Sequence, residues 1–197
     1  MMICQQVRLL GDSIFDNGAY VGPNEFDVRA HLDRFLESSD WSVDLRAVDG
    51  AVTRDVHEQL GAIEDRDNAV MVLSVGGNDA LSLMPLLAET TLSTFAGVLV
   101  ELERRIRAFR DEYAALIRCL VTTEMPLIVC TIYNPCFDNE DLQNASMAGL
   151  SLFNDVIMTE AVAHNLPIID LRRVCDTSVC FANPIEPSHE GGARIAD

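Results

Sequence analysis

Three short segments of the sequence hold residue types that could act together on a carbonyl group. The first is Gly11-Asp12-Ser13, which follows an apolar run. A glycine lets the chain turn sharply as it leaves a strand, so Ser13 would face a cleft and could serve as a nucleophile. Taken alone, the tripeptide favours a simpler interpretation, in which Ser or Asp caps a helix.

Asn78 belongs to the second segment, Gly-Gly-Asn-Asp at residues 76–79. Its side-chain amide could donate to the negative oxygen that develops in the transition state of acyl transfer. Two glycines and an asparagine also suit a tight turn, and this alternative stays open.

The third segment is Glu186-Pro187-Ser188-His189. A carboxylate and an imidazole three residues apart in one loop can meet, which fixes the imidazole tautomer and leaves the other ring nitrogen free as a base. The alternative is a surface loop in which Ser188 caps the last helix. The other three histidines fall in helical patterns and are interpreted as ordinary surface positions: His31, His57 and His164.

The elements around these segments alternate between strands and helices. Apolar runs predict strands at residues 7–10, 41–48, 69–75, 126–133 and 166–171. Helical periodicity predicts helices at residues 26–36, at residues 52–60, from Leu92 to Leu116, at residues 145–164 and from His189 onward. In the first of these, Val28, Leu32 and Phe35 share one face.

This alternation predicts an α/β fold, with a parallel sheet inside a three-layer α/β/α sandwich. Ligands bind at the carboxyl ends of the strands in such sheets. The three motifs follow the first, third and last strands, so we expect them to meet at one edge. Their joint placement is a much stronger indication of acyl transfer than any one motif alone.

The composition predicts one soluble domain spanning residues 1–197. The net charge of −17 repels nucleic acid and anionic membranes, so neither is an expected partner. No stretch approaches the roughly 20 apolar residues that span a bilayer. The N-terminus is too short and too polar for a signal peptide, so we expect a cytoplasmic location without stable membrane insertion. The sequence ends inside the last expected helix, which is compatible with a truncated C-terminal helix.

Six cysteines are present, with no Cys-x-x-Cys and no paired metal-ligand spacing, so we expect no metal site. Cys175 and Cys180 could close a small disulfide loop, which a reducing compartment disfavours.

The motifs together resemble those of the SGNH hydrolases, also called GDSL-type lipases and esterases, over nearly the whole chain. Residues 11–17, Gly-Asp-Ser-Ile-Phe-Asp-Asn, stand against a family Gly-Asp-Ser-Leu, and residues 76–79 match Gly-x-Asn-Asp. Gly50 is a looser match to the glycine of the second family block. Residues 186–189 match Asp-x-x-His, with Glu186 in place of the usual aspartate.

The resemblance implies a flavodoxin-like parallel sheet of about five strands and a serine esterase that works through an acyl-enzyme on Ser13. It implies His189 as general base, oriented by Glu186, whose extra methylene must fold back to reach the imidazole. The implied oxyanion hole consists of the backbone N–H groups of Ser13 and Gly50 and the side chain of Asn78. No cofactor is implied.

The sequence also bears on two alternative functions. An α/β-hydrolase needs Gly-x-Ser-x-Gly, which is absent. An inactive or non-catalytic ligand-binding domain of flavodoxin-like fold stays open, although no phosphate-binding glycine motif supports it.

We expect a small-molecule ester as substrate, in a partly apolar cleft lined by Leu81, Leu83, Met84 and Phe137. The oligomeric state is not predicted.

Overall fold

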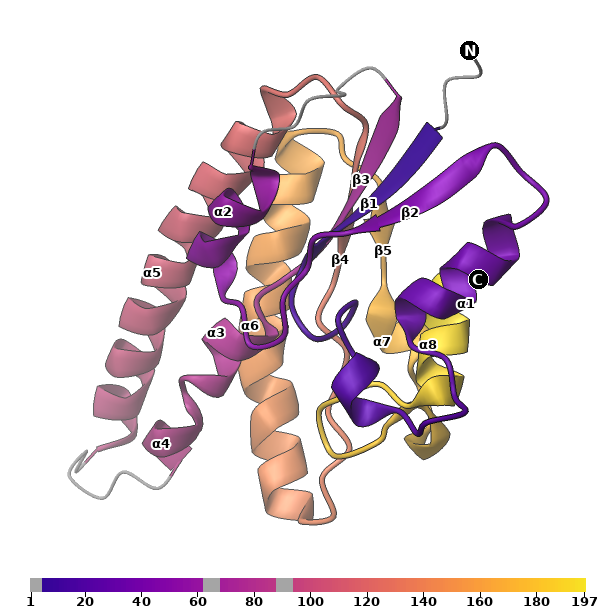
Figure 1. Ribbon diagram of the computed structural model, residues 1–197. Helices are drawn as coiled ribbons and strands as arrows, with labels where there is room; N and C mark the ends of the chain where they lie inside the picture. The colour runs from indigo at the N-terminus through magenta and orange to yellow at the C-terminus, as the bar shows by residue number, and fades with distance from the viewer. Residues whose placement is uncertain (1–4, 62–67, 88–93) are drawn as a thin grey trace.

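The computed structural model describes residues 5–61, 68–87 and 94–197 of the chain. At its centre lies a five-stranded parallel sheet with the strand order β2-β1-β3-β4-β5 (Figure 1). The strands are β1 (Gln5–Gly11), β2 (Trp41–Leu45), β3 (Ala69–Ser74), β4 (Leu127–Cys130) and β5 (Ile168–Ile169). The predicted α/β fold with about five parallel strands is confirmed.

Helices cover both faces of the sheet. On one face α5 (Phe95–Val121) packs beside α6 (Glu140–Ala163), and on the other α1 (Val28–Leu36) packs against α8 (His189–Ala196) (Figure 1). The shorter helices are α2 (Val56–Leu60), α3 (Gly77–Leu81), α4 (Met84–Leu87) and α7 (Leu171–Val174), and the 3-10 turns are η1 (Gly18–Tyr20), η2 (Thr53–Asp55) and η3 (Ser178–Cys180).

Strand β1 joins the two halves of the core. Successive side chains of a strand point to opposite faces of the sheet. Leu10 therefore packs in the core that contains Leu116 of α5, and Leu9 packs in the core that contains Val28 of α1. Both leucines are 1% exposed, so the end of this strand is fixed from both sides.

The long helix α5 is apolar along one stripe, but only its second half lies in the core. Ile106, Phe109, Tyr113 and Leu116 are buried as the periodicity predicts. Phe95 is 78% exposed, and Leu92 lies outside the described residues. Near the start of α5 the predicted stripe is therefore exposed and not part of the core. Its side chains there line the cavity described below.

Several predicted boundaries shift. Strand β2 ends at Leu45 and not at residue 48, because the next two backbone N–H groups, of Arg46 and Ala47, both donate to the carbonyl of Leu9. Helix α6 begins at Glu140, earlier than predicted, because Asn139 accepts a capping hydrogen bond from the backbone of Leu142.

Three further expectations can be compared with the structure. The prediction that Phe35 shares the buried face of α1 is wrong, because its side chain is 62% exposed. The thiols of Cys175 and Cys180 are free, so they form no disulfide. Within the described ranges, none of the helices is both long enough and apolar enough to cross a membrane. The cytoplasmic location stays a prediction.

The backbone of β1 leaves the sheet at Gly11 in a conformation that requires glycine. Its φ is +131°, and an added Cβ would overlap the backbone carbonyl of Ser74 in β3. The two chains can touch at this point only because Gly11 has no side chain. The residues after Gly11 are thus directed out of the sheet immediately beside the end of β3.

We predict that Gly11→Ala lowers the free energy of unfolding by about 3 kcal/mol or more, because backbone strain adds to the overlap with Ser74. Urea unfolding measures the change. Gly149→Ala in α6 is the matched control, because a Cβ there meets nothing within 4 Å, and alanine should slightly stabilise the helix. Equal stability of Gly11→Ala and wild type would contradict the close approach of β1 to β3.

Candidate active site

A cavity of about 530 Å³ opens at the carboxyl ends of β1, β3 and β4. Four polar residues that line it come from chain segments far apart in sequence: Asp12, Ser13, Asn78 and Glu186. Its walls are apolar and include the residues predicted for the cleft, Leu81, Leu83, Met84 and Phe137, together with Phe95, Leu99 and Leu102 of α5. The exposed first half of the α5 stripe is therefore cavity wall.

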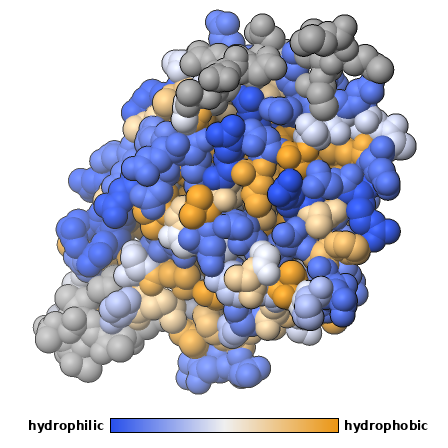
Figure 2. Space-filling model, viewed as in Figure 1, coloured by the Kyte–Doolittle hydropathy of each residue, from blue (hydrophilic) through white to orange (hydrophobic). Residues whose placement is uncertain are grey.

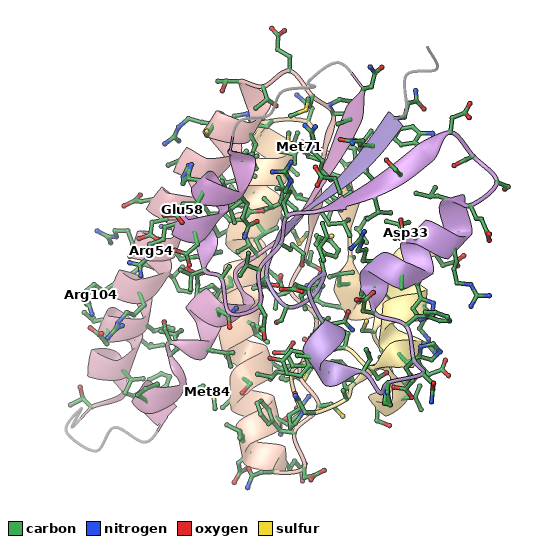
Figure 3. The ribbon with its side chains drawn as sticks, in the orientation of Figure 1. Asp33, Arg54, Glu58, Met71, Met84 and Arg104 are labelled. Carbon is green, nitrogen blue, oxygen red and sulfur yellow. The ribbon has the colours of Figure 1, made fainter. Side chains whose placement is uncertain are left out.

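Helices α3 and α4, which supply part of the cavity lining, lie in the lower part of the view in Figure 1. Figure 2 shows apolar side chains gathered on the lower half of this face, around α3 and α4. Met84 extends from α4 in this region (Figure 3). The charged residues among those that line the cavity, within the described part of the chain, are acidic. Arg54, which follows Gly50 by four residues, does not line the cavity and pairs with Asp55 (Figure 3).

Ser13 lies in the turn that follows β1 and is 6% exposed. Asp12 organises this turn, since its backbone N–H donates to Ser74 and its side chain accepts from the N–H of Ile14 at 3.2 Å. Among the hydrogen bonds of the described residues, none uses the backbone N–H of Ser13. That N–H is therefore available to a ligand.

Glu186 lies beside Ser13 in the cavity. The Ser13 hydroxyl is near enough to the Glu186 carboxylate to lower its pKa, and Glu186 as a whole is 7% exposed. Its Oε2 atom is buried and accepts no hydrogen bond from the residues described. Burial raises the pKa of this carboxyl above its ordinary value, the Ser13 hydrogen bond lowers it, and the charge of Asp49 raises it further.

The backbone around Glu186 is held at several points. Its N–H donates to the side chain of Asn183 at 3.0 Å, and its carbonyl accepts from Ala182 at 2.9 Å. The carbonyl of Ile185 accepts from the hydroxyl of Tyr133 at 2.6 Å. The position of the carboxylate beside Ser13 therefore rests on a braced loop.

His189 lies at the start of α8 and points to a different set of partners. Its Nδ1 lies 3.0 Å from the backbone nitrogen of Phe26, which donates to it, and 3.1 Å from Nε2 of His31. It does not line the cavity, and no hydrogen bond to Ser13 or Glu186 is found within the described residues. The sequence pattern treated His31 as an ordinary surface position, whereas the structure packs it on His189 with ring centroids 4.6 Å apart.

The predicted oxyanion donors lie near each other. The side-chain amide of Asn78 lines the cavity and donates to the carbonyl of Ala51 at 3.0 Å, which leaves its second N–H free for a ligand. Gly50 precedes that carbonyl, has a φ of +80° and is exposed outside the cavity lining. Across the described chain, no hydrogen bond uses the N–H of Gly50.

The simpler interpretations of the second and third motifs, a tight turn and a helix cap, are both found in the structure. Gly76 has a φ of +119° and precedes α3, so the segment is also a tight turn. Ser188 caps α8 by accepting from the N–H of Gly191 at 3.1 Å. A local structural role therefore does not exclude a role in the cavity.

Two residues of the site were missed by sequence reasoning. Asp12 is 2% exposed, and burial raises its pKa to about 8, with further increases from Glu186 and Asp79 and an opposing effect of the Ile14 hydrogen bond. Asn17 is fully buried and joins the loops, because its amide donates to the carbonyl of Pro187 and its oxygen accepts from Val28. The signal for both was their place in the first motif, residues 11–17.

Comparison with solved structures finds the same fold in several ester-cleaving proteins. An acetyl xylan esterase, AlAXEase, has a TM-score of 0.73 at 18% identity over 98% of this chain and 96% of that one. A lipase from a goat rumen metagenome, Lip_vut3, gives 0.74 at 18% identity over 98% and 94%. Phospholipase A1 from Streptomyces albidoflavus NA297 gives 0.70 at 17% identity over 97% and 95%. At these identities the likeness shows the fold alone.

Comparison at the sequence level gives the family. No curated protein sequence matches the chain. A family model described as the GDSL-like Lipase/Acylhydrolase family matches residues 9–191, which is nearly the whole chain and includes all four motifs. The resemblance predicted from those motifs is confirmed: the chain belongs to the GDSL-like lipase/acylhydrolase family and is a hydrolase that acts on ester bonds.

Proposed function

We propose that this protein cleaves carboxylic esters through an acyl-enzyme on Ser13. The observation that supports this most is that Ser13 and a buried carboxylate, that of Glu186, line the same apolar cavity. A hydroxyl bound to a proton acceptor can attack the ester carbonyl, and the alcohol then leaves. Water releases the acyl group in a second step by the same route.

The negative charge on the carbonyl oxygen needs hydrogen-bond donors in this mechanism. We assign this role to the backbone N–H groups of Ser13 and Gly50 and to the side chain of Asn78. The free N–H groups of Ser13 and Gly50 support the assignment, as does the bond from Asn78 to Ala51 that orients the amide.

Two side chains are candidates for the base that takes the Ser13 proton. His189 is the candidate of the sequence pattern, and its imidazole would have to reach Ser13 from its place beside Phe26 and His31. Glu186 is the candidate supported by its place beside Ser13 in the cavity lining. The nucleophile and the oxyanion donors are the same in both cases.

The substrate is a neutral ester with an apolar acyl chain. The cavity walls are apolar side chains of α3, α4, α5 and α6, which suit a hydrocarbon chain. Asp12 and Glu186 line the same cavity, and they disfavour an anionic group near the reacting carbon. We therefore expect neutral acyl esters to react faster than acyl-CoA or anionic phospholipids.

We predict that Ser13→Ala lowers kcat for nitrophenyl butyrate by at least about 10³-fold, because the nucleophile is lost. A fluorophosphonate probe should label the wild type at Ser13 and leave the variant unlabelled, which mass spectrometry of the digested protein detects. Retention of most activity in Ser13→Ala would contradict the proposal. Absence of any label on the wild type would favour the non-catalytic ligand-binding alternative.

We predict that kcat/KM rises with acyl length from acetyl to hexanoyl esters, by up to about fourfold for each methylene that the cavity buries. Leu99→Asn, which makes one wall of the cavity polar, should flatten this rise. The control is Val100→Asn, because Val100 is 70% exposed on the same helix and does not line the cavity. Equal slopes for Leu99→Asn and wild type would place the acyl chain elsewhere.

Burial raises the pKa values of both acidic groups beside Ser13, and for Asp12 the increase is large. Asp12, with a pKa of about 8, keeps its proton at pH 7, so the cavity avoids a second full negative charge beside the nucleophile. A carboxyl whose pKa is higher in the folded chain than in the unfolded chain binds its proton more tightly when folded. Stability therefore falls as the pH rises from about 4 toward 8.

We predict that Asp12→Asn unfolds at nearly the same urea concentration as wild type near pH 4 and is more stable by up to about 6 kcal/mol at pH 9, because asparagine cannot ionise. Urea unfolding at both pH values measures this. Asp111→Asn, at an exposed position of α5, is the control and should follow wild type. A constant difference between Asp12→Asn and wild type at both pH values would mean that Asp12 ionises normally.

A further inference from the structure

We infer that Glu186 is itself the general base of the ester reaction and takes the Ser13 proton directly, without an intervening imidazole. This inference rests on the proposed function, since it assigns a residue to the first step of that reaction. It departs from the sequence pattern, in which a carboxylate three residues before a histidine serves only to orient that histidine.

The placement of the carboxylate is the first support. Glu186 lines the cavity together with Ser13 and Asn78, and the Ser13 hydroxyl is near enough to its carboxylate to lower the pKa of Glu186. A proton acceptor must lie within hydrogen-bond reach of the proton that it removes when the substrate is bound. The position of Glu186 beside Ser13 suits it for this role, and its loop is braced by Asn183 and Tyr133.

The unpartnered oxygen is the second support. A buried carboxylate that only orients a histidine should have that histidine as its hydrogen-bond partner. Oε2 of Glu186 is buried and has no partner among the described residues, so it retains capacity to bind a proton. An oxygen without a hydrogen-bond partner is poorly suited to a purely structural role and well suited to accept a proton.

The surroundings of His189 are the third support. Its Nδ1, one of the two ring nitrogens that Glu186 could have bound, is engaged by the backbone N–H of Phe26 and lies against His31. Ser188 and the backbone of Cys180 hold the start of α8, because the N–H of Ser188 donates to the Cys180 carbonyl at 2.9 Å and its hydroxyl donates to Val179 at 2.6 Å. The imidazole is thus directed toward α1 and away from the cavity.

The chemistry is balanced without another group. Ser13 Oγ forms a bond to the ester carbon as its proton passes to the Glu186 carboxylate. The carbonyl then re-forms, the bond to the alcohol oxygen breaks, and the proton of Glu186 passes to that oxygen. In the second step water attacks the acyl carbon and gives its proton to Glu186, which returns it to Ser13 as the acid leaves.

Burial makes Glu186 a stronger base than an exposed glutamate. Its pKa is raised above 4.5, mainly by desolvation. The titratable groups that face it are Asp12 after β1, Asp49 after β2, Tyr20 in η1 and Tyr133 after β4. The two tyrosines have raised pKa values, and Asp12 is protonated near neutrality, which leaves Asp49 as a neighbouring negative charge. The reaction should therefore accelerate as the pH rises through the titration of Glu186, because only the ionised form accepts the proton.

The test compares Glu186→Gln, His189→Gln and Ser13→Ala, with Glu190→Gln as a matched control at an exposed position of α8. Hydrolysis of nitrophenyl butyrate and labelling of Ser13 by a fluorophosphonate are followed from pH 4 to pH 9. We expect Glu186→Gln to lose at least about 10³-fold in kcat, the range of a general base. His189→Gln should lose less than about tenfold and keep the ascending limb of the wild-type pH profile, and Glu190→Gln should match wild type.

A second measurement separates chemistry from folding. Glu186→Ala should recover activity in added formate, because the small carboxylate can occupy the vacated space and accept the proton, whereas chloride at equal ionic strength should have no effect. Circular dichroism and urea unfolding establish that each variant is folded. A merely structural role of Glu186 would give no recovery specific to formate.

The failures of the two proposals are distinguishable. Loss of activity in His189→Gln comparable to that in Glu186→Gln would overturn the inference, because it would mean that the imidazole takes the Ser13 proton. The proposed acyl-enzyme on Ser13 would not be affected by that result. High activity of Glu186→Gln would overturn it as well. Full activity in Ser13→Ala, or no labelling of Ser13 in wild type, would overturn the proposed function and the inference with it.

Discussion

The close contact between β1 and β3 at Gly11 is the constraint on which the site depends. The backbone of Gly11 meets the carbonyl of Ser74, and its φ of +131° turns the chain out of the sheet at that point. Asp12 then donates its N–H to the same carbonyl, so Ser13 follows a turn fixed by backbone geometry. Leu9 and Leu10 anchor the strand on both faces. A nucleophile held in this way needs no rearrangement of the sheet to face its substrate.

Burial of carboxyl groups around this turn has an energetic cost, and the structure offsets it in different ways. Asp79 accepts two hydrogen bonds of 3.0 Å from Thr53, which favour its ionised form although burial raises its pKa. Asp12 avoids the cost by keeping a proton, because its pKa is about 8. Glu186 has the Ser13 hydroxyl nearby and one buried oxygen without a partner in the described part of the chain. Poorly compensated buried charge of this kind is typical of groups that react.

Much of the fold could be predicted from sequence, and the errors have physical reasons. Continuous apolar runs identified the strands because both faces of a parallel sheet are buried. Periodicity identified α5 but could not tell core from cavity wall, since Phe95 and Ile106 satisfy the same pattern while only Ile106 is buried. The motifs at strand ends predicted that Ser13, Asn78 and Glu186 would meet. The partners of His189 could not be predicted, because Phe26 and His31 lie about 160 residues earlier in sequence and reach it only through the packing of α1 on α8.

The replacement of aspartate by Glu186 connects these observations. The sequence pattern has an aspartate at this position, which is one methylene shorter than glutamate. Under that pattern the longer side chain of Glu186 would have to fold back to reach His189. In the structure the Glu186 carboxylate lies in the cavity beside Ser13, and its Oε2 atom has no partner among the described residues. The imidazole has a different partner, because the backbone N–H of Phe26 donates to Nδ1 of His189. The acid and the imidazole of the last motif therefore do not pair as the sequence pattern expects, and in our proposal the carboxylate serves the nucleophile directly.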